Sequence, residues 1–470
     1  MSSSKWPAFF CVAAGVFMST LDGSIVNVTL PVIMRDLETD FVTVEWVMMA
    51  YLLTVSALLM AFGRLSDITG RRRMYVCGLF VFSLSSLFCG LSVSIAQLVL
   101  SRIAQGVGAA MIMSCTQAII AGAFPASERG KALGMLGAVV ASGLTTGPAV
   151  GGWLMDMFSW HAIFIVNVPA GFLVICLSLR MLPPIHHPDM KGLPFDLQGA
   201  FFMAAGMTAL LMLATHAAQW GTDHWATRGF LLCLAVSLAG LIRDTLTAPH
   251  PFLAPVLLKT RLFLLPVISA MIMFMSLFAL IFLMPFYLMH PCGYPERETG
   301  LIMVTPFACF FVFAPLSGVL YDRLGSRGLC TVGMILLTGA FYALAHLPPA
   351  PDLTDIICRL AMAGTGMAVF TAPNNAAVMS SVPPQFMGTA SGTVATMRNL
   401  GMVLGIAFTG AVFNAVFTDL SGGRQFHGWR PELMSVFMAS FYYAMLSAAA
   451  VGLVGTAITF LRGPDGKCRK

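Results

Sequence analysis

A single aspartate inside an apolar segment is the first residue of this sequence that could do chemistry. Asp22 lies in MSTLDGSIVNVTLP, residues 18–31, which otherwise reads as a membrane-spanning helix. A carboxylate at the bilayer centre costs roughly 2.5–3.5 kcal/mol on insertion scales, so an intramembrane acid is functional by default. Because desolvation favours the protonated carboxyl group, we interpret Asp22 as a proton carrier; the alternative is a structural carboxylate paired with a neighbouring helix. We expect no other acid deep in any span.

A second charged residue in an apolar segment is Arg102. It begins a polar and small-residue stripe, Arg102, Gln105, Gly106 and Ala109, at the i, i+3, i+4, i+7 spacing of one helix face. A guanidinium group cannot lose its proton in a protein, so it must face partners or water. We predict electrostatic coupling between Arg102 and Asp22, directly or through substrate or water. The alternative is that Arg102 only caps nearby backbone carbonyls.

Other polar residues within the predicted spans are candidates to line a substrate cavity. The alternative for them is an ordinary, hydrogen-bonded place in the interior. Arg359 lies near the outer half of its span, where a long side chain can reach the interface. The cavity candidates are Asn27, Gln105, Asn374 and Arg398.

Two glycine-containing segments are candidates for conformational change. In GLTTGPAVGG, residues 143–152, Gly143, Gly147 and Gly151 form a small-residue stripe that allows another helix to approach closely. Pro148 removes one helix hydrogen bond and favours a bend. This pattern fits tight packing alone, a bend at a moving interface, or both.

The second segment, GRLSDITGRRR, residues 63–73, is a short basic turn around an acid. Two interpretations of this turn are open. Its positive charges orient the protein in the membrane and do nothing more, or the acid and the arginines hold the helix ends in place through ion pairs. The gating candidates in it are Gly63, Asp67, Gly70 and Arg71.

The elements that position these residues are predicted to be membrane-spanning helices. The chain has 470 residues, is 58% hydrophobic and 10% charged, and has a mean hydropathy of +0.85, which excludes a soluble globular protein. Apolar runs of spanning length predict fourteen helices, including 44–63 and 160–181. With the N-terminus in the cytoplasm, inside segments hold eighteen of the 26 basic residues and outside segments five. This bias predicts both termini in the cytoplasm and assigns the net charge to topology rather than to nucleic acid.

An internal repeat divides the predicted spans into halves. GRLSDITGRR, residues 63–72, is echoed by GVLYDRLGSR, residues 318–327, which places Asp322 255 residues after Asp67. Arg102 and Arg359 are related by nearly the same offset, and Asp322 and Arg359 are further gating candidates. We therefore predict an all-α polytopic membrane protein with a six-helix bundle at 1–182, two extra spans at 183–258 and a second six-helix bundle at 259–470. Parallel repeats of this kind are typical of secondary transporters with a site between the halves.

Several function classes have no support in the sequence. The nucleotide-binding pattern GxxxxGK[ST], the HExxH and GxSxG motifs and any CxxC pair are absent, and the eleven cysteines show no metal-ligand spacing. We expect no enzyme activity, no metal and no cofactor, so the energy source should be an ion gradient. A channel or a membrane sensor is the alternative class, but a channel more often shows symmetric pore-lining elements than two halves with one buried acid.

Taken together, these motifs resemble the major facilitator superfamily, and within it the fourteen-span drug:proton antiporters of the EmrB/QacA type. The resemblance covers nearly the whole chain. It rests on GRLSDITGRRR, LVLSRIAQGVGAA, GLTTGPAVGG, LDGSIVNVTLP and WHAIFIVNVPAG. The chain departs from the usual patterns at Ser24, Thr29 and His161.

The resemblance implies a function and partners. It implies proton-driven export of amphipathic small molecules across the cytoplasmic membrane by alternating access, with Asp22 and Arg102 in coupling and Asp67 and Arg71 in gating. It implies a monomer in the lipid bilayer; some relatives also use a periplasmic adaptor. We see no acid inside the second-half spans, which favours neutral, monocationic or weakly acidic substrates over dications. The alternative is a dedicated exporter of one metabolite, lipid or siderophore.

Overall fold

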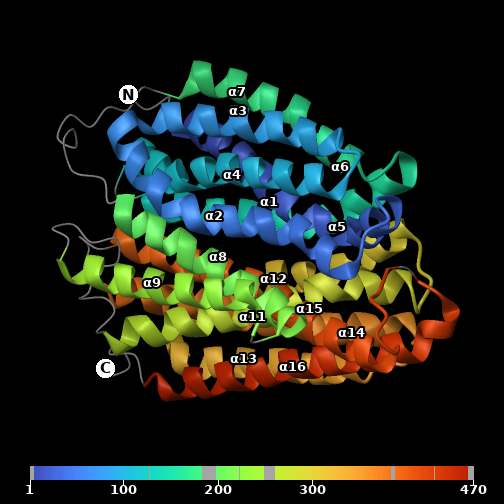
Figure 1. Ribbon diagram of the computed structural model, residues 1–470. Coiled ribbons are helices and arrows are strands. Elements are labelled where there is room, and N and C mark those ends of the chain that lie inside the picture. Colours follow the sequence, from blue (N-terminus) through green and yellow to red (C-terminus); the bar gives the residue numbers. More distant parts are fainter. Residues whose placement is uncertain are drawn as a thin grey trace.

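The chain folds into a bundle of long, roughly parallel helices (Figure 1). The computed structural model describes residues 5–125, 128–182, 197–221, 223–247, 260–382, 387–427 and 429–463. Within these ranges every regular element is a helix. We call the end of the bundle where the first helix begins and the last one ends the terminal end, and the opposite end the distal end.

The first half of the chain comprises α1 (Lys5–Asp36), α2 (Phe41–Thr69), α3 (Arg71–Gly90), α4 (Ile95–Ala123), α5 (Arg129–Met157), α6 (Ala162–Ile165) and α7 (Asn167–Met181). A hairpin of α8 (Leu197–Trp220) and α9 (Trp225–Thr247) follows. The second half comprises α11 (Arg261–Met289), α12 (Glu296–Leu324), α13 (Ser326–Ala345), α14 (Leu353–Ser380), α15 (Met387–Leu420), η3 (Pro431–Leu433) and α16 (Met434–Leu461).

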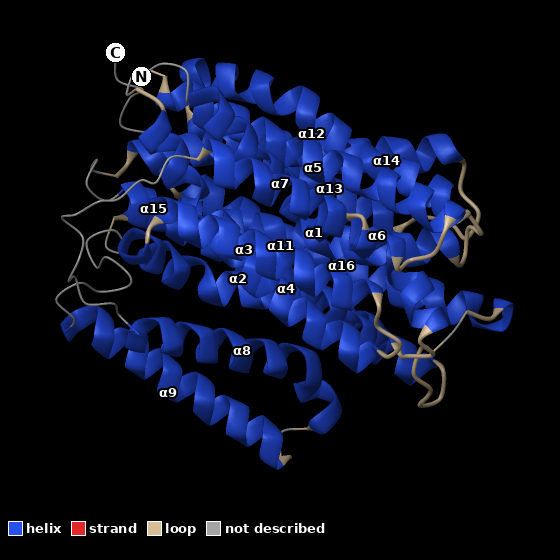
Figure 2. Cartoon of the chain, turned by 90° about the horizontal axis from the view of Figure 1, so that it is seen from above, coloured by secondary structure: helices blue, strands red, loops and turns tan. Residues whose placement is uncertain are grey.

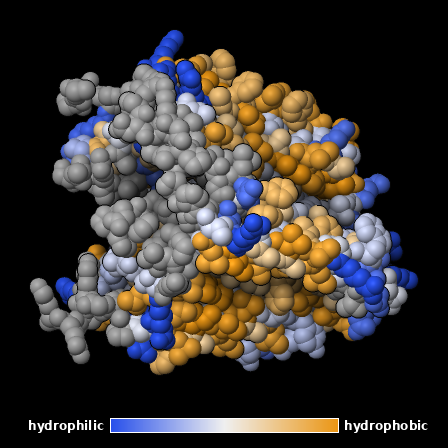
Figure 3. Space-filling model, turned by 60° about the vertical axis from the view of Figure 1, so that its left-hand side comes forward, coloured by the Kyte–Doolittle hydropathy of each residue, from blue (hydrophilic) through white to orange (hydrophobic). Residues whose placement is uncertain are grey.

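The described helices have the length and composition of membrane spans. Thirteen segments of the described chain qualify, with α6 and α7 together forming one, and α8 adds a shorter apolar stretch, Phe201–His216. The face in Figure 3 carries a broad band of apolar side chains with hydrophilic ones at its right-hand edge. An integral membrane protein of many helices is therefore confirmed, while the count of fourteen spans stays a prediction.

The two halves turn the chain in the same way at the position of the sequence repeat. Gly70 joins α2 to α3 with φ +99°, and Gly325 joins α12 to α13 with φ +72°; this region favours glycine because it has no Cβ. Two residues after each glycine, Arg72 donates to the Leu179 carbonyl of α7, and the Arg327 Nε donates to the Phe460 carbonyl of α16 at 2.9 Å. The repeated sequence therefore forms equivalent turns in the two halves. In each half, an arginine after the turn binds a backbone carbonyl of the last helix.

Helix packing repeats as well. The pairs α1–α5, α2–α4, α3–α4 and α3–α7 correspond to α11–α15, α12–α14, α13–α14 and α13–α16. Glycine allows the closest of these approaches: a Cβ at Gly78 would lie 3.0 Å from the Gly108 carbonyl oxygen, and one at Gly333 would lie 2.8 Å from that of Gly366. The two halves contact each other through two helix pairs that the repeat relates, α2–α15 and α5–α12. A third contact between the halves is α1–α11.

The α8–α9 hairpin lies at one edge of the bundle (Figure 2). Its first helix, α8, contacts α2 of the first half and α15 of the second. Met203 and Met207 of α8 pack with Leu53 of α2 and Leu400 of α15. The hairpin thus covers the seam between the two halves from one side.

Candidate functional site

Asp22 lies in the middle of α1 at the centre of a polar network. Its carboxylate is fully buried, with 0% of the residue exposed. The Arg102 Nη1 donates to Asp22 Oδ2 at 2.6 Å, and Gln105 Nε2 and Asn167 Nδ2 each donate to Asp22 Oδ1 at 2.9 Å. The structure therefore brings the predicted pair, Asp22 and Arg102, into direct contact.

The helix spacing of α4 explains how the network forms. Arg102 and Gln105 are three residues apart and share one face, so both reach Asp22, and Arg102 Nη1 also donates to Gln105 Oε1 at 2.5 Å. Gln105 Nε2 is 2.8 Å from the Ser86 hydroxyl of α3. The Arg102 Nε donates to the Val47 carbonyl of α2 at 2.9 Å. Arg102 is thus both an ion-pair partner and a cap of a backbone carbonyl.

Aromatic rings complete the site. The Arg102 guanidinium lies over the Tyr51 ring at 4.2 Å and near the Phe164 ring at 5.7 Å, and the Tyr51 hydroxyl donates to the Ser19 carbonyl at 3.2 Å. These rings exclude water around the charges and supply cation–π attraction. Removing one partner from such a buried pair costs about 3–5 kcal/mol.

Asn167 is a site residue that sequence reasoning missed. The predicted single span 160–181 is divided into α6 and α7 at Val166. Pro169 lacks the amide hydrogen that would bind the carbonyl of Ile165, which favours a break there. Asn167 is the first residue of α7 and turns its amide to Asp22. The available signal was the Asn-x-Pro sequence inside an apolar run.

A second buried acid, Glu45, lies near the beginning of α2, where the sequence predicted no buried charge. Helix α2 begins at Phe41, N-capped by Asp40, whose side chain accepts from Thr43 N at 2.8 Å. Glu45 is 1% exposed, and its Oε1 has no hydrogen-bond partner in the described chain. The predicted span began at residue 44, where an acid ordinarily reaches water, so only packing against another helix could reveal its burial. Asp244 near the end of α9 is also buried, at 9% exposure.

The cavity candidates are placed in different surroundings. Asn374 lies inside the second half, where its amide donates to the Pro266 carbonyl at 3.1 Å and accepts from Arg462 Nη1 at 3.0 Å. Asn27 of α1 is buried, and its Oδ1 has no partner among the described residues. Arg398 of α15 lies 5.7 Å from the Phe274 ring of α11, and its Nε has no described partner. Gln105 belongs to the Asp22 network instead.

The glycine stripe of α5 packs on α1. A Cβ at Gly143 would overlap the Thr20 hydroxyl, one at Gly147 would overlap the Ser24 hydroxyl, and one at Gly151 would lie 2.8 Å from Ile25 Cγ1. The opposite side of α5 meets α12: a Cβ at Gly300 would overlap the Pro148 carbonyl. Helix α5 is therefore held closely by both halves at once.

The remaining gating candidates lie near the helix ends. At Gly63 an added Cβ would meet nothing within 4 Å, and Gly70 forms the α2–α3 turn. Arg71 Nη1 donates to the Ala118 carbonyl of α4 at 3.2 Å. Arg359, the sequence counterpart of Arg102, pairs with Asp355 at 2.7 Å within α14. The side chains of Asp67 and Asp322 lie outside the described part of the structure.

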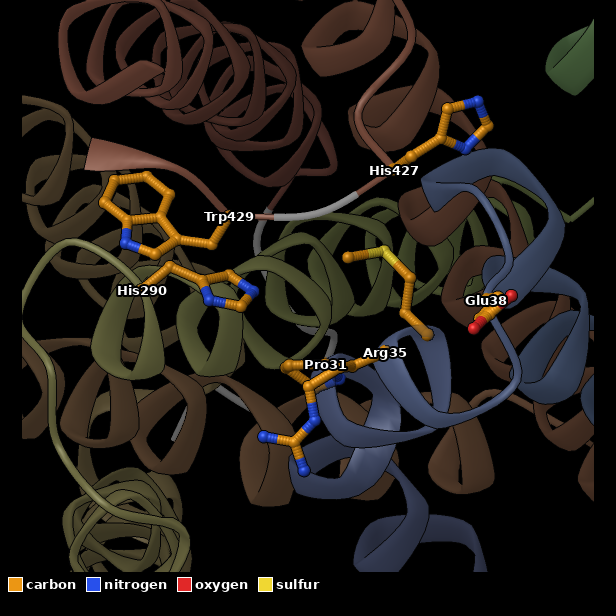
Figure 4. Close-up of a pocket in the computed structure, with 7 residues that line it drawn as sticks. Pro31, Arg35, Glu38, His290, His427 and Trp429 are labelled. Atoms are coloured by element: carbon orange, nitrogen blue, oxygen red, sulfur yellow. The ribbon is translucent and has the colours of Figure 1, made fainter. Parts of the chain in front are cut away.

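A cavity of about 500 Å³ opens at the distal end between α1 and the second half. Figure 4 shows Pro31, Arg35 and Glu38 on one side and His290, His427 and Trp429 on the other. The His290 ring stacks on Trp429 with centroids 5.6 Å apart. Burial, helped by the positive charge of Arg35, lowers the pKa of His290 to about 4. The imidazole is therefore neutral at physiological pH.

Two repeated bundles of membrane-length helices, the first with an ion pair buried inside it, define a polytopic membrane protein of the transporter class. A profile of the Major Facilitator Superfamily matches residues 12–406. The chain belongs to this superfamily, and it is a membrane transporter and not an enzyme.

Relatives of known sequence match most of the chain. It is 33% identical over 465 residues to the riboflavin transporter RibZ of Clostridioides difficile, covering 98% of both chains. It is 34% identical over 410 residues to the uncharacterized transporter YebQ of Escherichia coli, covering 87% of this chain and 89% of that one. The multidrug resistance protein Stp of Mycobacterium tuberculosis is 31% identical over 424 residues, covering 88% and 77%.

A solved transporter has the same fold. The structure of a bacterial homologue of the human lysosomal transporter Spinster, in an inward-facing and unoccupied conformation, matches with a TM-score of 0.71. The match covers 98% of this chain and 97% of that one at 16% sequence identity. The likeness concerns the fold alone.

Proposed function

We propose that this protein is a proton-coupled exporter of amphipathic small molecules, of the fourteen-span drug:proton antiporter type. The observation that carries the proposal is the buried Asp22–Arg102 pair, because Asp22 is an intramembrane acid whose charge can be switched by one proton. Similarity to the multidrug resistance protein Stp and to the multidrug transporter MdtP of Bacillus subtilis supports drug-like substrates.

In the proposed mechanism, protonation of Asp22 weakens the link between α1 and α4. The neutral carboxyl group no longer balances the charge of Arg102, so the guanidinium must find another partner, through a shift of α1 against α4. Because α1 also packs tightly on α5, and α5 on α12, such a shift is transmitted to the contact between the halves. Rocking of 1–182 against 259–470 then alternates access, with the proton gradient as energy source and no cofactor.

For the substrate, the proposal favours compounds without a double positive charge. Arg398 and Phe274 offer a cation and an aromatic face in the second half, and no described acid lies near them on α11 or α15. A guanidinium group repels dications and attracts aromatic, neutral or weakly acidic molecules. We propose Arg398 and Asn27 as cavity residues on this ground.

For its surroundings, we propose a monomer in the cytoplasmic membrane with both termini inside. The asymmetric distribution of lysine and arginine supports this orientation. A periplasmic adaptor remains a proposed optional partner. Labelling of cysteines added to either terminus in intact cells and in inverted vesicles tests the sidedness.

The test of proton coupling uses Asp22→Asn in proteoliposomes. We expect the variant to lose substrate transport driven by an imposed proton gradient but to retain substrate counterflow, which needs no net proton movement. Retained counterflow is also the control for folding. Gradient-driven transport at the wild-type rate would show that the carboxylate is structural.

A second candidate is a dedicated transporter of one metabolite. It is favoured by the relative that aligns end to end with this chain, whose name is riboflavin transporter. Counterflow of labelled riboflavin, competed by a panel of amphipathic drugs, separates the two candidates. A broad panel of competitors supports the multidrug exporter, and competition by riboflavin-like compounds alone supports the dedicated transporter.

A further inference from the structure

A second cavity, of about 340 Å³, lies on the seam between the halves. Three elements line it: α2 of the first half, α8 of the hairpin and α15 of the second half. Its lining residues are Val42, Glu45, Thr215, Ala411, Asn414, Ala415, Thr418 and Asp419. All lie toward the distal ends of their helices, whereas Asp22 lies in the middle of α1.

Three oxygen atoms of this cavity have no hydrogen-bond partner among the described residues. They are Glu45 Oε1, Asn414 Oδ1 and Thr418 Oγ1. Glu45 is 1% exposed and Asn414 is 7% exposed. Asn414 and Thr418 are one turn apart on α15, so they present their oxygens on the same face. Within the described chain, the cavity therefore holds a buried carboxyl oxygen without a hydrogen bond, beside two other side-chain oxygens that have none.

The groups that face Glu45 do not supply a compensating positive charge. On α2 itself the near ionisable residue is the acid Asp40, and on α15 it is Asp419. On α8, the His216 Nδ1 lies 2.7 Å from the Thr215 hydroxyl. Arg102 of α4 reaches the Val47 carbonyl of α2, but its guanidinium is engaged with Asp22. Neither lysine nor arginine is among the residues that line the cavity.

Beside the cavity, α15 packs directly against the Glu45 carboxyl group. A Cβ at Gly410 of α15 would overlap that group, so the glycine makes room for it. Beside it, the Phe41 amide of α2 donates to the Phe426 carbonyl of the second half at 3.1 Å. The Phe41 ring lies 4.7 Å from that of Phe413 and 5.0 Å from that of Phe286. An ionised carboxylate whose Oε1 has no described hydrogen-bond partner would be strongly destabilising at this buried position.

We propose that Glu45 is a second proton site, separate from the Asp22 network, that is protonated while the distal seam is closed. One bound proton removes the charge and gives the carboxyl group an O–H donor of its own. When α2 and α15 separate, water reaches the carboxyl group, the O–H bond breaks and the proton passes to water on the distal side. Ionised Glu45 then opposes reclosure. The inference deepens the proposed proton-coupled transport and rests on it for its role in the cycle.

Infrared spectroscopy tests the protonation state directly. In the full-length protein in lipid nanodiscs at neutral pH, the difference between wild type and Glu45→Gln should contain the carbonyl stretch of one protonated carboxyl group. Asp156→Asn, which changes an exposed acid at the distal end of α5, should lack that band. A Glu45→Gln difference without the band would overturn the proposal.

Hydrogen exchange tests the effect on the seam. We expect exchange in residues 410–420, corrected for intrinsic pH dependence, to rise several-fold in wild type and in Asp156→Asn as the pH is raised. Glu45→Gln, which keeps the shape of a neutral carboxyl group, should stay protected. If exchange in Glu45→Gln rose with pH as it does in wild type, the proposal would be overturned. It would also be overturned if protection from exchange changed with Na⁺ concentration at constant pH, because that would indicate a bound metal ion. The measurement uses no substrate and no gradient, so its outcome is independent of whether Asp22 drives transport.

Discussion

At the scale of single residues, the network around Asp22 ties five helices together through one carboxylate. Asp22 of α1 accepts from α4 and α7, Arg102 reaches α2, and Gln105 reaches α3. Every donor aimed at Asp22 compensates the burial of its charge. Loss of one donor therefore weakens a contact that joins these helices.

Asn167→Ala removes one of these donors. Among the described residues, Asp22 Oδ1 then keeps only Gln105 as a donor, so we expect a changed pH profile of transport and a loss of stability of about 1.5–3 kcal/mol, the contribution of a hydrogen bond to a charged group. Transport rates over a pH series and thermal unfolding check this. Asn375→Ala, at an exposed asparagine of α14, is the matched control. An unshifted profile would mean that Asn167 is structural.

His290 should make the stability of the folded protein depend on pH. Its pKa is about 4 in the folded protein and about 6.5 when unperturbed. Between these values the unfolded chain binds a proton that the folded protein does not, so stability falls as the pH drops from about 6.5 to 4. We expect the thermal midpoint to fall in this window and His290→Gln to reduce the slope. His346→Gln, at an exposed histidine, should leave the slope unchanged.

At the scale of elements, α5 differs from its neighbours because glycines line two of its sides. One side meets α1 through Gly143, Gly147 and Gly151, and the other meets α12 beside Pro148. Small residues at these positions let backbones approach closely. Any added atom must therefore move a helix or a neighbouring hydroxyl group.

Gly147→Ala should separate α5 from α1, because its new methyl group overlaps the Ser24 hydroxyl. Overpacking of this kind costs about 1–3 kcal/mol, so we expect a lower thermal midpoint and slower transport. Gly137→Ala on the same helix, where nothing lies within 4 Å, should be neutral or slightly stabilising, since alanine is the better helix former. Equal effects of the two substitutions would contradict the role of the stripe.

At the scale of the whole molecule, contacts within a half and contacts between halves have different consequences. Gly333 packs against Phe370 N of its own half, where an added Cβ would lie 2.7 Å away. Gly300 packs against the Pro148 carbonyl of the other half. A methyl group at the first position strains one bundle, whereas a methyl group at the second pushes two bundles apart.

Gly300→Ala should therefore favour separation at the distal end. We expect faster hydrogen exchange in residues 410–420 while protection inside α13 and α14 is preserved. Gly333→Ala should instead lower protection within α13 and α14. If Gly300→Ala destabilised both halves equally, the seam would not be the point of movement.

The sequence predicted the helical membrane architecture and the Asp22–Arg102 pair, because isolated charges in apolar runs have few ways to be compensated. It did not reveal Asn167, whose position depends on the helix break before Pro169. Nor did it reveal Glu45, because its burial is caused by Gly410, a residue 365 positions away. It placed Asn374 among the cavity residues, whereas the structure engages its amide with Pro266 and Arg462. The surroundings of these three residues depend on contacts between distant segments, which a local sequence pattern does not reveal.

The hydrogen bond that crosses the distal seam has a consequence for how this protein can evolve. It joins the main-chain amide of Phe41 to the main-chain oxygen of Phe426, so substitutions of either side chain leave both atoms in place. Proline at position 41 is the exception, and the helix itself would tolerate it because the first turn needs no donor there. Lineages can thus vary the aromatic residues of the seam while the alignment of the two halves is inherited with the backbone.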